Sequence, residues 1–164
     1  MYIDKYWDNF IGGSDDSLNL VAFLEDQKKE EISLGEIFHK IGLNKQNWDF
    51  HRTAEPLCFM HSLGMEMDFH FAIDVITDLA AILLECNISG GVNLHDLFES
   101  EDTPSRYIRI TASAEEYDRM DNALADFTAD PISYDLYEML GDDILEMAED
   151  VETLRRELHE RNKR

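Results

Sequence analysis

Basic residues, cysteines and long apolar runs are all scarce in this sequence. The 164 residues include 14 Lys and Arg against 36 Asp and Glu, which gives a formal net charge of −22. A charge of that sign and size repels nucleic acids and anionic membranes, and it attracts cationic partners. The excess is larger than solubility requires, so it favours a basic partner.

The few cysteines and the short apolar runs bear on where the protein works. Cys58 and Cys86 are too few for a disulfide framework. The longest strongly apolar run, LAAILL at 79–84, is too short to span a bilayer. The N-terminal sequence MYIDKYWDNF has neither the basic segment nor the apolar core of a signal peptide. We therefore expect a cytoplasmic protein with reduced thiols that binds no membrane.

No recognisable catalytic or cofactor motif occurs in the sequence. Cys58 and His61 have the spacing of a zinc ligand pair, but no second pair recurs at a zinc-site interval. Alternation along a strand would also place these two side chains on opposite faces. No G-x-S-x-G sequence marks a nucleophile, and the paired aspartates lack the alternating oxygen ligands of a calcium loop. We therefore expect no metal, no cofactor and no enzymatic activity.

The stretch NFIGGSDDSLNLVAFL at 9–24 raises the question of a phosphate site, because a glycine turn before a helix offers free backbone N–H groups. Asp15 and Asp16 stand where the phosphate would bind, and no lysine follows to neutralise it. The same two aspartates complement the positive end of a helix dipole. The sequence therefore predicts a plain turn, with Ser14 or Asp15 as the N-cap of a helix.

The sequence contains enough apolar material for a single domain over residues 1–164. Hydrophobic residues make up 44% of the chain and aromatic residues 10%, so the charge does not imply disorder. The segment at about 72–86 is apolar around most of a helical circumference, which predicts a buried central helix. SLGEIFHKIG at 33–42 and SAEEYDRM at 113–120 open with capping-box patterns and predict two further helices.

A last long helix is expected from about Ser133 to the C-terminal tail. Its apolar residues recur at spacings that resemble a heptad seam. They are Leu140, Ile144, Met147, Val151, Leu154 and Leu158. This seam either packs within the chain or forms the contact of a homodimer. Basic residues gather in the tail that follows, where cations complement the negative end of the helix dipole.

Two segments alternate with the period of a strand. LCFMHSLGMEMDFHF at 57–71 predicts a hairpin, and the alternative is a helix that begins near Glu66. RYIRITAS at 106–113 places Ile108 and Ile110 on one face of a strand. The expected fold is therefore α+β and mostly helical, with a small antiparallel sheet and a long C-terminal helix.

Three segments carry a family resemblance: IGGSDDSLNLVAFL, RITASAEEYDRMDNALADF and SYDLYEMLGDDILEMAEDVETL. In a small, acidic chain they resemble bacterial immunity proteins, the antidotes encoded beside polymorphic toxins such as those of contact-dependent growth inhibition. The resemblance implies that the partner is a cognate toxin domain, often a basic nuclease (an RNase, a tRNase or a DNase). It also implies inhibition by covering the toxin's active site. Members share this role and no common signature, so the resemblance assigns no residue.

The charge and the resemblance lead to one hypothesis, in which an acidic surface competes with RNA or DNA for a cationic cleft. Acidic residues in turns next to Gly or Pro tend to be exposed, so we take them as candidates for toxin binding. They form three clusters: Asp15 and Asp16; Glu99, Glu101 and Asp102; Asp142 and Asp143. The alternatives are a small cytosolic enzyme without a recognisable motif, and a regulatory dimer that uses the C-terminal seam.

Overall fold

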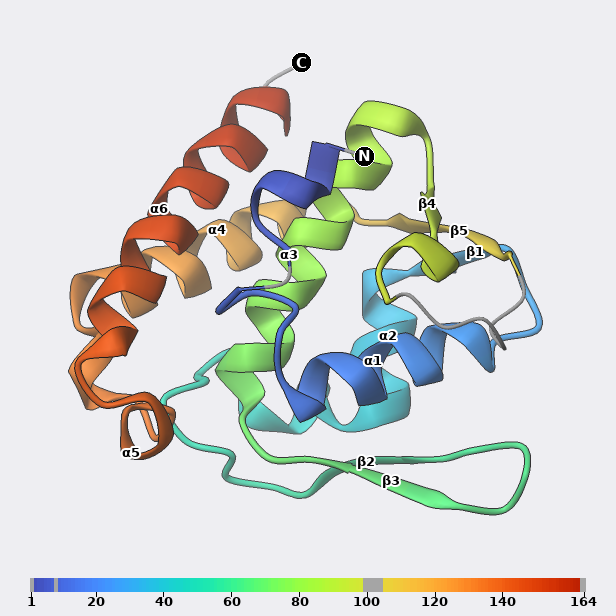
Figure 1. Ribbon diagram of the computed structural model, residues 1–164, viewed down its shortest axis with the longest axis horizontal. Coiled ribbons are helices and arrows are strands. Elements are labelled where there is room, and N and C mark those ends of the chain that lie inside the picture. The colour runs from blue at the N-terminus through green and yellow to red at the C-terminus, as the bar shows by residue number, and fades with distance from the viewer. Residues whose placement is uncertain (1, 8, 99–104, 163–164) are drawn as a thin grey trace.

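A single buried helix, α3 (Ala72–Ser89), runs through the middle of the molecule, and the other elements surround it (Figure 1). The computed structural model describes residues 2–7, 9–98 and 105–162. Every residue of α3 from Ala72 to Cys86 is buried. The predicted central helix is therefore confirmed, and it begins after the hairpin rather than near Glu66. Over the described ranges, no helix is long and apolar enough to cross a membrane.

The N-terminal part of the chain covers one side of α3. A 3-10 helix, η1 (Tyr2–Lys5), leads through the glycine turn into α1 (Asp15–Glu25). Ser14 is the N-cap of α1, because its side chain accepts a hydrogen bond from the Ser17 backbone N–H. After α1 come α2 (Leu34–Ile41) and a second 3-10 helix, η2 (Leu43–Gln46).

The strands form two separate sheets. The hairpin of β2 (Leu57–Met60) and β3 (Glu66–Phe69) is antiparallel, as predicted, and it extends from the body of the molecule (Figure 1). The other sheet has the order β1-β5-β4. It consists of β1 (Glu31–Ser33), β4 (Val92–Asn93) and β5 (Tyr107–Thr111).

This second sheet is mixed. β4 pairs with β5 in antiparallel, as expected for a small antiparallel sheet, whereas β1 pairs with β5 in parallel, which the sequence does not predict. The charged run EDQKKEE at 25–31 is, by its sequence, a solvated helix end or loop, and only Ile32 of the strand that follows is buried. A distant residue fixes the segment before the strand: the Arg106 guanidinium donates hydrogen bonds to the carbonyls of Glu25, Gln27 and Lys29. The strand therefore depends on a tertiary contact that a local pattern cannot reveal.

The C-terminal part covers the opposite side of α3 (Figure 1). It comprises α4 (Ala114–Ala129), η4 (Pro131–Ser133), α5 (Tyr137–Leu140) and α6 (Asp143–Asn162). The expected long C-terminal helix is present, but it begins at Asp143 and not near Ser133. Gly141, with a φ of 59°, separates α5 from α6, and the four-residue α5 turns away from the long helix.

The predicted heptad-like seam packs inside the chain. From Ile144 to Leu158 all its members are buried, and α6 lies against α4 and α3. None of these buried side chains is left for the contact of a homodimer. The N-terminus also binds to this helix, since Glu157 accepts hydrogen bonds from the hydroxyls of Tyr2 and Tyr6 and pairs with Lys5.

Candidate partner-binding site

The glycine turn before α1 binds a carboxylate of the protein itself. The Gly12 backbone N–H donates a hydrogen bond of 2.8 Å to Asp78 in α3. A Cβ at Gly12 would lie 2.2 Å from the Trp7 ring, and one at Gly13 would lie 2.1 Å from the Asn9 carbonyl oxygen. The glycines therefore allow close packing, and the amide that a phosphate would need is already used by Asp78.

Asp16, a predicted partner-binding residue, is only 2% exposed, so the expectation that it faces solvent is wrong. Its carboxylate accepts hydrogen bonds from the backbone N–H groups of His70 (2.8 Å) and Phe71 (2.9 Å). Phe71 is the N-cap of α3 and has no side-chain oxygen with which to cap the helix. Asp16, in the first turn of α1, thus provides the hydrogen-bond acceptor for the backbone N–H groups that lead into α3.

Two further aspartates of α3 are buried beside Asp16. Asp78 is fully buried and accepts hydrogen bonds from Gly12 and from the Ser17 hydroxyl, the latter at 2.6 Å. Asp74 lies one helical turn earlier and is 2% exposed. Among the described residues, the Ser14 side chain is the hydrogen-bond donor that lowers the pKa of its carboxylate. Neither aspartate is among the residues predicted from the sequence, although two acids four positions apart in a mostly apolar helix are a usable signal.

Burial and mutual repulsion shift the protonation of these two aspartates. Burial, and then the charge of Asp16, raise the pKa of Asp74 to about 7, although the Ser14 hydrogen bond lowers it. Burial, and then the charge of Asp74, raise the pKa of Asp78 well above its ordinary range. Among the ion pairs of the described residues, none joins Asp16, Asp74 or Asp78 to a Lys or Arg.

A pocket of about 290 Å³ opens between the starts of α1 and α3 and the helix α5. Asp74 lines it together with Asp15, Asp16, Ser14 and His70. Its walls are otherwise mainly apolar and come from three parts of the chain: Phe10, Phe71, Leu136, Met139, Leu140 and Met147. Met139 is 54% exposed and lies at the solvent side of this wall. The site thus combines an apolar wall with a buried carboxylate.

The remaining predicted residues stand in different positions relative to this pocket. Asp15 is exposed and lines it. Asp142 and Asp143 are exposed at the start of α6, directly after the pocket-lining end of α5. The first predicted cluster therefore lies at the pocket, and the Asp142–Asp143 cluster follows the pocket-lining residue Leu140 in the sequence without lining the pocket itself. The third cluster, Glu99, Glu101 and Asp102, lies outside the described residues.

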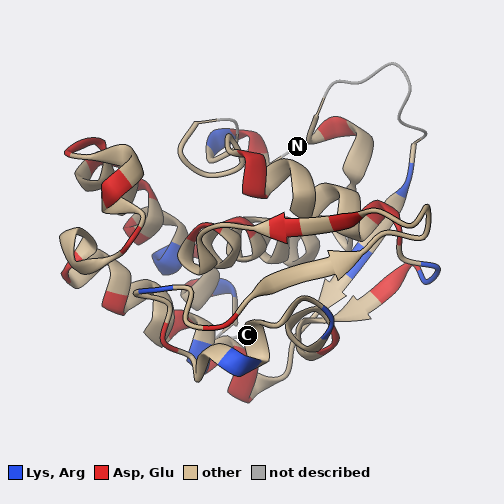
Figure 2. Ribbon diagram, turned by 90° about the horizontal axis from the view of Figure 1, so that it is seen from below, with Lys and Arg blue, Asp and Glu red and all other residues tan. Residues whose placement is uncertain are grey.

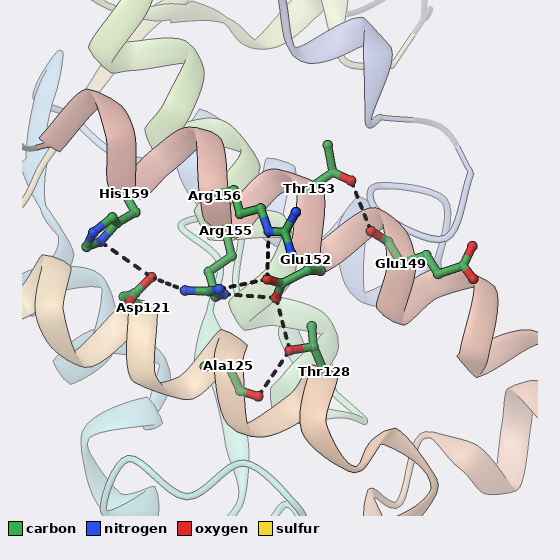
Figure 3. Close-up of polar contacts among 9 residues, drawn as sticks. All are labelled: Asp121, Ala125, Thr128, Glu149, Glu152, Thr153, Arg155, Arg156 and His159. Carbon is green, nitrogen blue, oxygen red and sulfur yellow. Dashed lines mark hydrogen bonds and ion pairs between the residues drawn. The ribbon is translucent and has the colours of Figure 1, made fainter.

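Acidic groups on the α4–α6 face are bound differently (Figure 3). The Arg155 guanidinium pairs with Glu152 at 2.7 Å and with Asp121 at 3.1 Å. Glu152 also accepts hydrogen bonds from Arg156 and from the Thr128 hydroxyl. The hydrogen bond from Arg155 is the main cause that lowers the pKa of Glu152 to about 2. Basic residues of the C-terminal region thus serve the fold.

The strand hairpin carries a third group of titratable residues. Cys58, Glu66 and Asp68 present ligand atoms within 4.8 Å of one another on its outward face. His61, the other half of the predicted zinc-like spacing, instead lies 3.6 Å from Asp26. Exposed acidic groups gather in this way without a metal, and burial raises the pKa of the Cys58 thiol, which disfavours the thiolate. We assign no metal to this group.

Acidic positions occur along most elements of the ribbon, whereas basic positions are few and separated (Figure 2). The chain is thus a strongly acidic α+β protein with a pocket that combines an apolar wall and a buried aspartate. A family model described as immunity protein 68 matches residues 2–158, so the chain belongs to the immunity protein 68 family. No curated protein and no solved structure matches the chain. Membership supports a toxin-neutralising role and a cognate toxin as the partner.

Proposed function

We propose that this immunity protein neutralises a basic nuclease toxin in the cytoplasm by covering its active-site cleft with an acidic surface. A nuclease cleft is cationic because it must bind phosphates, so an acidic protein competes with RNA or DNA for it. The toxin would be of the type delivered in contact-dependent growth inhibition. The protein acts by binding alone and has no catalytic step.

One observation carries this proposal beyond family membership. The exposed carboxylate of Asp15 lines a pocket whose wall is mainly apolar, and the exposed Asp142 and Asp143 come shortly after its wall residue Leu140 in the sequence. Protein interfaces combine an apolar centre with a polar rim, and this region has both parts. Charged rim groups mainly raise the association rate, whereas the centre provides most of the affinity. The cluster of Glu99, Glu101 and Asp102 stays a second candidate for the same charged rim.

The proposal is tested with the toxin domain encoded beside the immunity gene. Wild-type protein should form a salt-sensitive complex with it in a pull-down and should protect cells that express it. Each of the three acidic clusters is then reversed to lysine. Because Asp16 is buried and supports the fold, Asp15→Lys alone represents the first cluster. Reversal of a true contact cluster should reduce the affinity by orders of magnitude.

A matched control comes from α4, which does not line the pocket. Asp118 is exposed, and Asp118→Lys changes the net charge by the same amount as Asp15→Lys. The control should weaken the complex only through the change in the net charge of the protein. If wild-type protein fails to bind the toxin at low salt, the proposed function is wrong. If it binds and all cluster reversals still protect fully, the acidic surface is wrong and the immunity role stands.

A further inference from the structure

We propose that the pocket between α1, α3 and α5 receives one lysine or arginine side chain of the toxin, whose cationic head binds the Asp74 carboxylate. This inference rests on the proposed function and adds the anchor of its interface. It assigns a binding role to a residue of the buried helix α3, while the exposed acids act at the rim.

The shape and lining of the pocket fit one long basic side chain. Its volume of about 290 Å³ is at the lower limit for small-molecule sites, so it suits a single side chain better than a cofactor. Lys and Arg bury their aliphatic stems along apolar surface and keep the charged head at a polar group. Phe10, Phe71 and Met139 would contact the stem, and Asp74 would contact the head.

The hydrogen bonds around Asp74 leave its carboxylate with too few donors. Asp16 receives two backbone N–H groups, and Asp78 receives a backbone N–H and the Ser17 hydroxyl. Among the described residues, no backbone N–H donates to Asp74. The Ser14 hydroxyl is the one donor that stabilises its ionised form, and the Ser14 oxygen also lies 3.1 Å from that of Ser17. A serine has one hydroxyl hydrogen, and Ser17 already donates its own to Asp78, so the Ser14 hydrogen is shared between two acceptors.

An uncompensated carboxylate in the wall of a pocket selects its occupant. A phosphate or a carboxylate would lie beside the Asp16 carboxylate, and none of the described residues that line the pocket is a Lys or Arg that could bind it. A metal ion would need several open oxygen ligands, and those of Asp16 and Asp78 are already bonded within the protein. A neutral aliphatic group would contact the apolar walls but would leave the Asp74 carboxylate without a partner. A basic side chain satisfies both the apolar walls and the charge.

The inference is tested by measuring association and dissociation rates of the complex with the adjacent-gene toxin. Asp74→Asn keeps the shape of the side chain and removes its charge. We expect it to raise the dissociation rate at least tenfold and to leave the association rate within twofold, because a buried charge contributes little to steering. Asp118→Asn, an exposed acid outside the pocket, should change the dissociation rate less than twofold.

A second variant blocks the pocket without touching any aspartate. Met139 is half-exposed on the pocket wall, so Met139→Trp can fold normally while its larger ring obstructs the entrance. We expect the same faster dissociation. Unchanged melting temperatures for this variant would show that loss of the pocket, and not of the fold, weakens the complex. If the complexes of both variants dissociate no faster than the wild-type complex, the inference is wrong.

Small probes test the pocket by itself. Nα-acetyl-lysine amide and Nα-acetyl-arginine amide should shift the NMR resonances of Met139 and Met147, and Nα-acetyl-norleucine amide should not. The shifts should disappear in Asp74→Asn. Absence of shifts with both basic probes would contradict the inference. If wild-type protein does not bind the toxin at all, the proposed function fails; if it binds and Asp74→Asn dissociates no faster, only the basic anchor fails.

Discussion

The pocket and the α4–α6 face both gather acidic side chains, but only the second supplies cations to pair with them. At the α4–α6 face, Arg155 joins Glu152 and Asp121, so the acids of two helices hold those helices together (Figure 3). At the pocket, three aspartates are buried with amide and hydroxyl donors only. Proteins rarely bury unpaired charge without a functional reason. Asp16 and Asp78 serve the fold through these donors, as Glu152 and Asp121 do through cations. Asp74 is therefore the acid that we propose for a partner.

The two regions also respond to pH in opposite directions. Glu152 has a lowered pKa of about 2, so its contribution to stability is present above its ordinary pKa and is lost as the pH falls through 2. Asp74 has a raised pKa of about 7, so the folded state binds its proton more tightly than the unfolded state does. Its ionisation therefore destabilises the protein increasingly as the pH rises from about 4 to 7.

The largest expected effect comes from adding an acid to the core at a position where neither a cation nor a hydrogen-bond donor can pair with it. Ile76 is fully buried in α3 between the levels of Asp74 and Asp78. Ile76→Asp places a charge among apolar side chains, which should cost about 3–5 kcal/mol of unfolding free energy. Urea denaturation measures it, with Ile76→Val, expected to cost about 1 kcal/mol, as the size control. A wild-type midpoint for Ile76→Asp would contradict the burial of α3.

Much of this architecture follows from local patterns in the sequence. The apolar circumference of 72–86, the alternation at 57–71, and the caps at Ser14, Ser33 and Ser113 all correspond to observed elements. Each of these signals lies within one turn, one strand or one helix face. Strand β1 was missed, because its pairing with β5 and the Arg106 hydrogen bonds before it come from far along the chain.

The candidate site was only partly predictable for the same reason. Glycine-flanked acids correctly indicated Asp15, Asp142 and Asp143 as exposed. The same rule failed for Asp16, whose exposure depends on where the start of α3 lies in space. Asp74 and Asp78 were passed over because an acid in an apolar helix does not reveal whether a pocket opens beside it. Which acids are paired is a tertiary property, and the comparison of the two regions required the structure.

A smaller and opposite effect is expected from neutralising the pocket. At pH 8 Asp74 is ionised in both the folded and unfolded states, and its burial then destabilises the fold. Asp74→Asn should therefore raise the unfolding free energy by about 2 kcal/mol at pH 8. Below about pH 4 the carboxyl is protonated in both states, and the two proteins should be nearly equal. Thermal unfolding from pH 4 to 8 measures the difference; a gap that shrinks as the pH rises would exclude the raised pKa.

The smallest expected effect comes from removing a cation on the α4–α6 face. Arg155→Met keeps the aliphatic stem but leaves Glu152 and Asp121 without their shared partner, which should cost about 1 kcal/mol because these side chains are partly exposed. NMR titration should then show the pKa of Glu152 moving up towards its ordinary value. Lys29→Met is the control: it breaks an exposed pair with Glu36, 3.9 Å apart, and should cost less than about 0.5 kcal/mol. If the two substitutions reduce the unfolding free energy equally, the acids paired with Arg155 hold α4 and α6 together no better than any surface pair does. The acids of the two regions would then differ in their burial and not in the strength of their pairing.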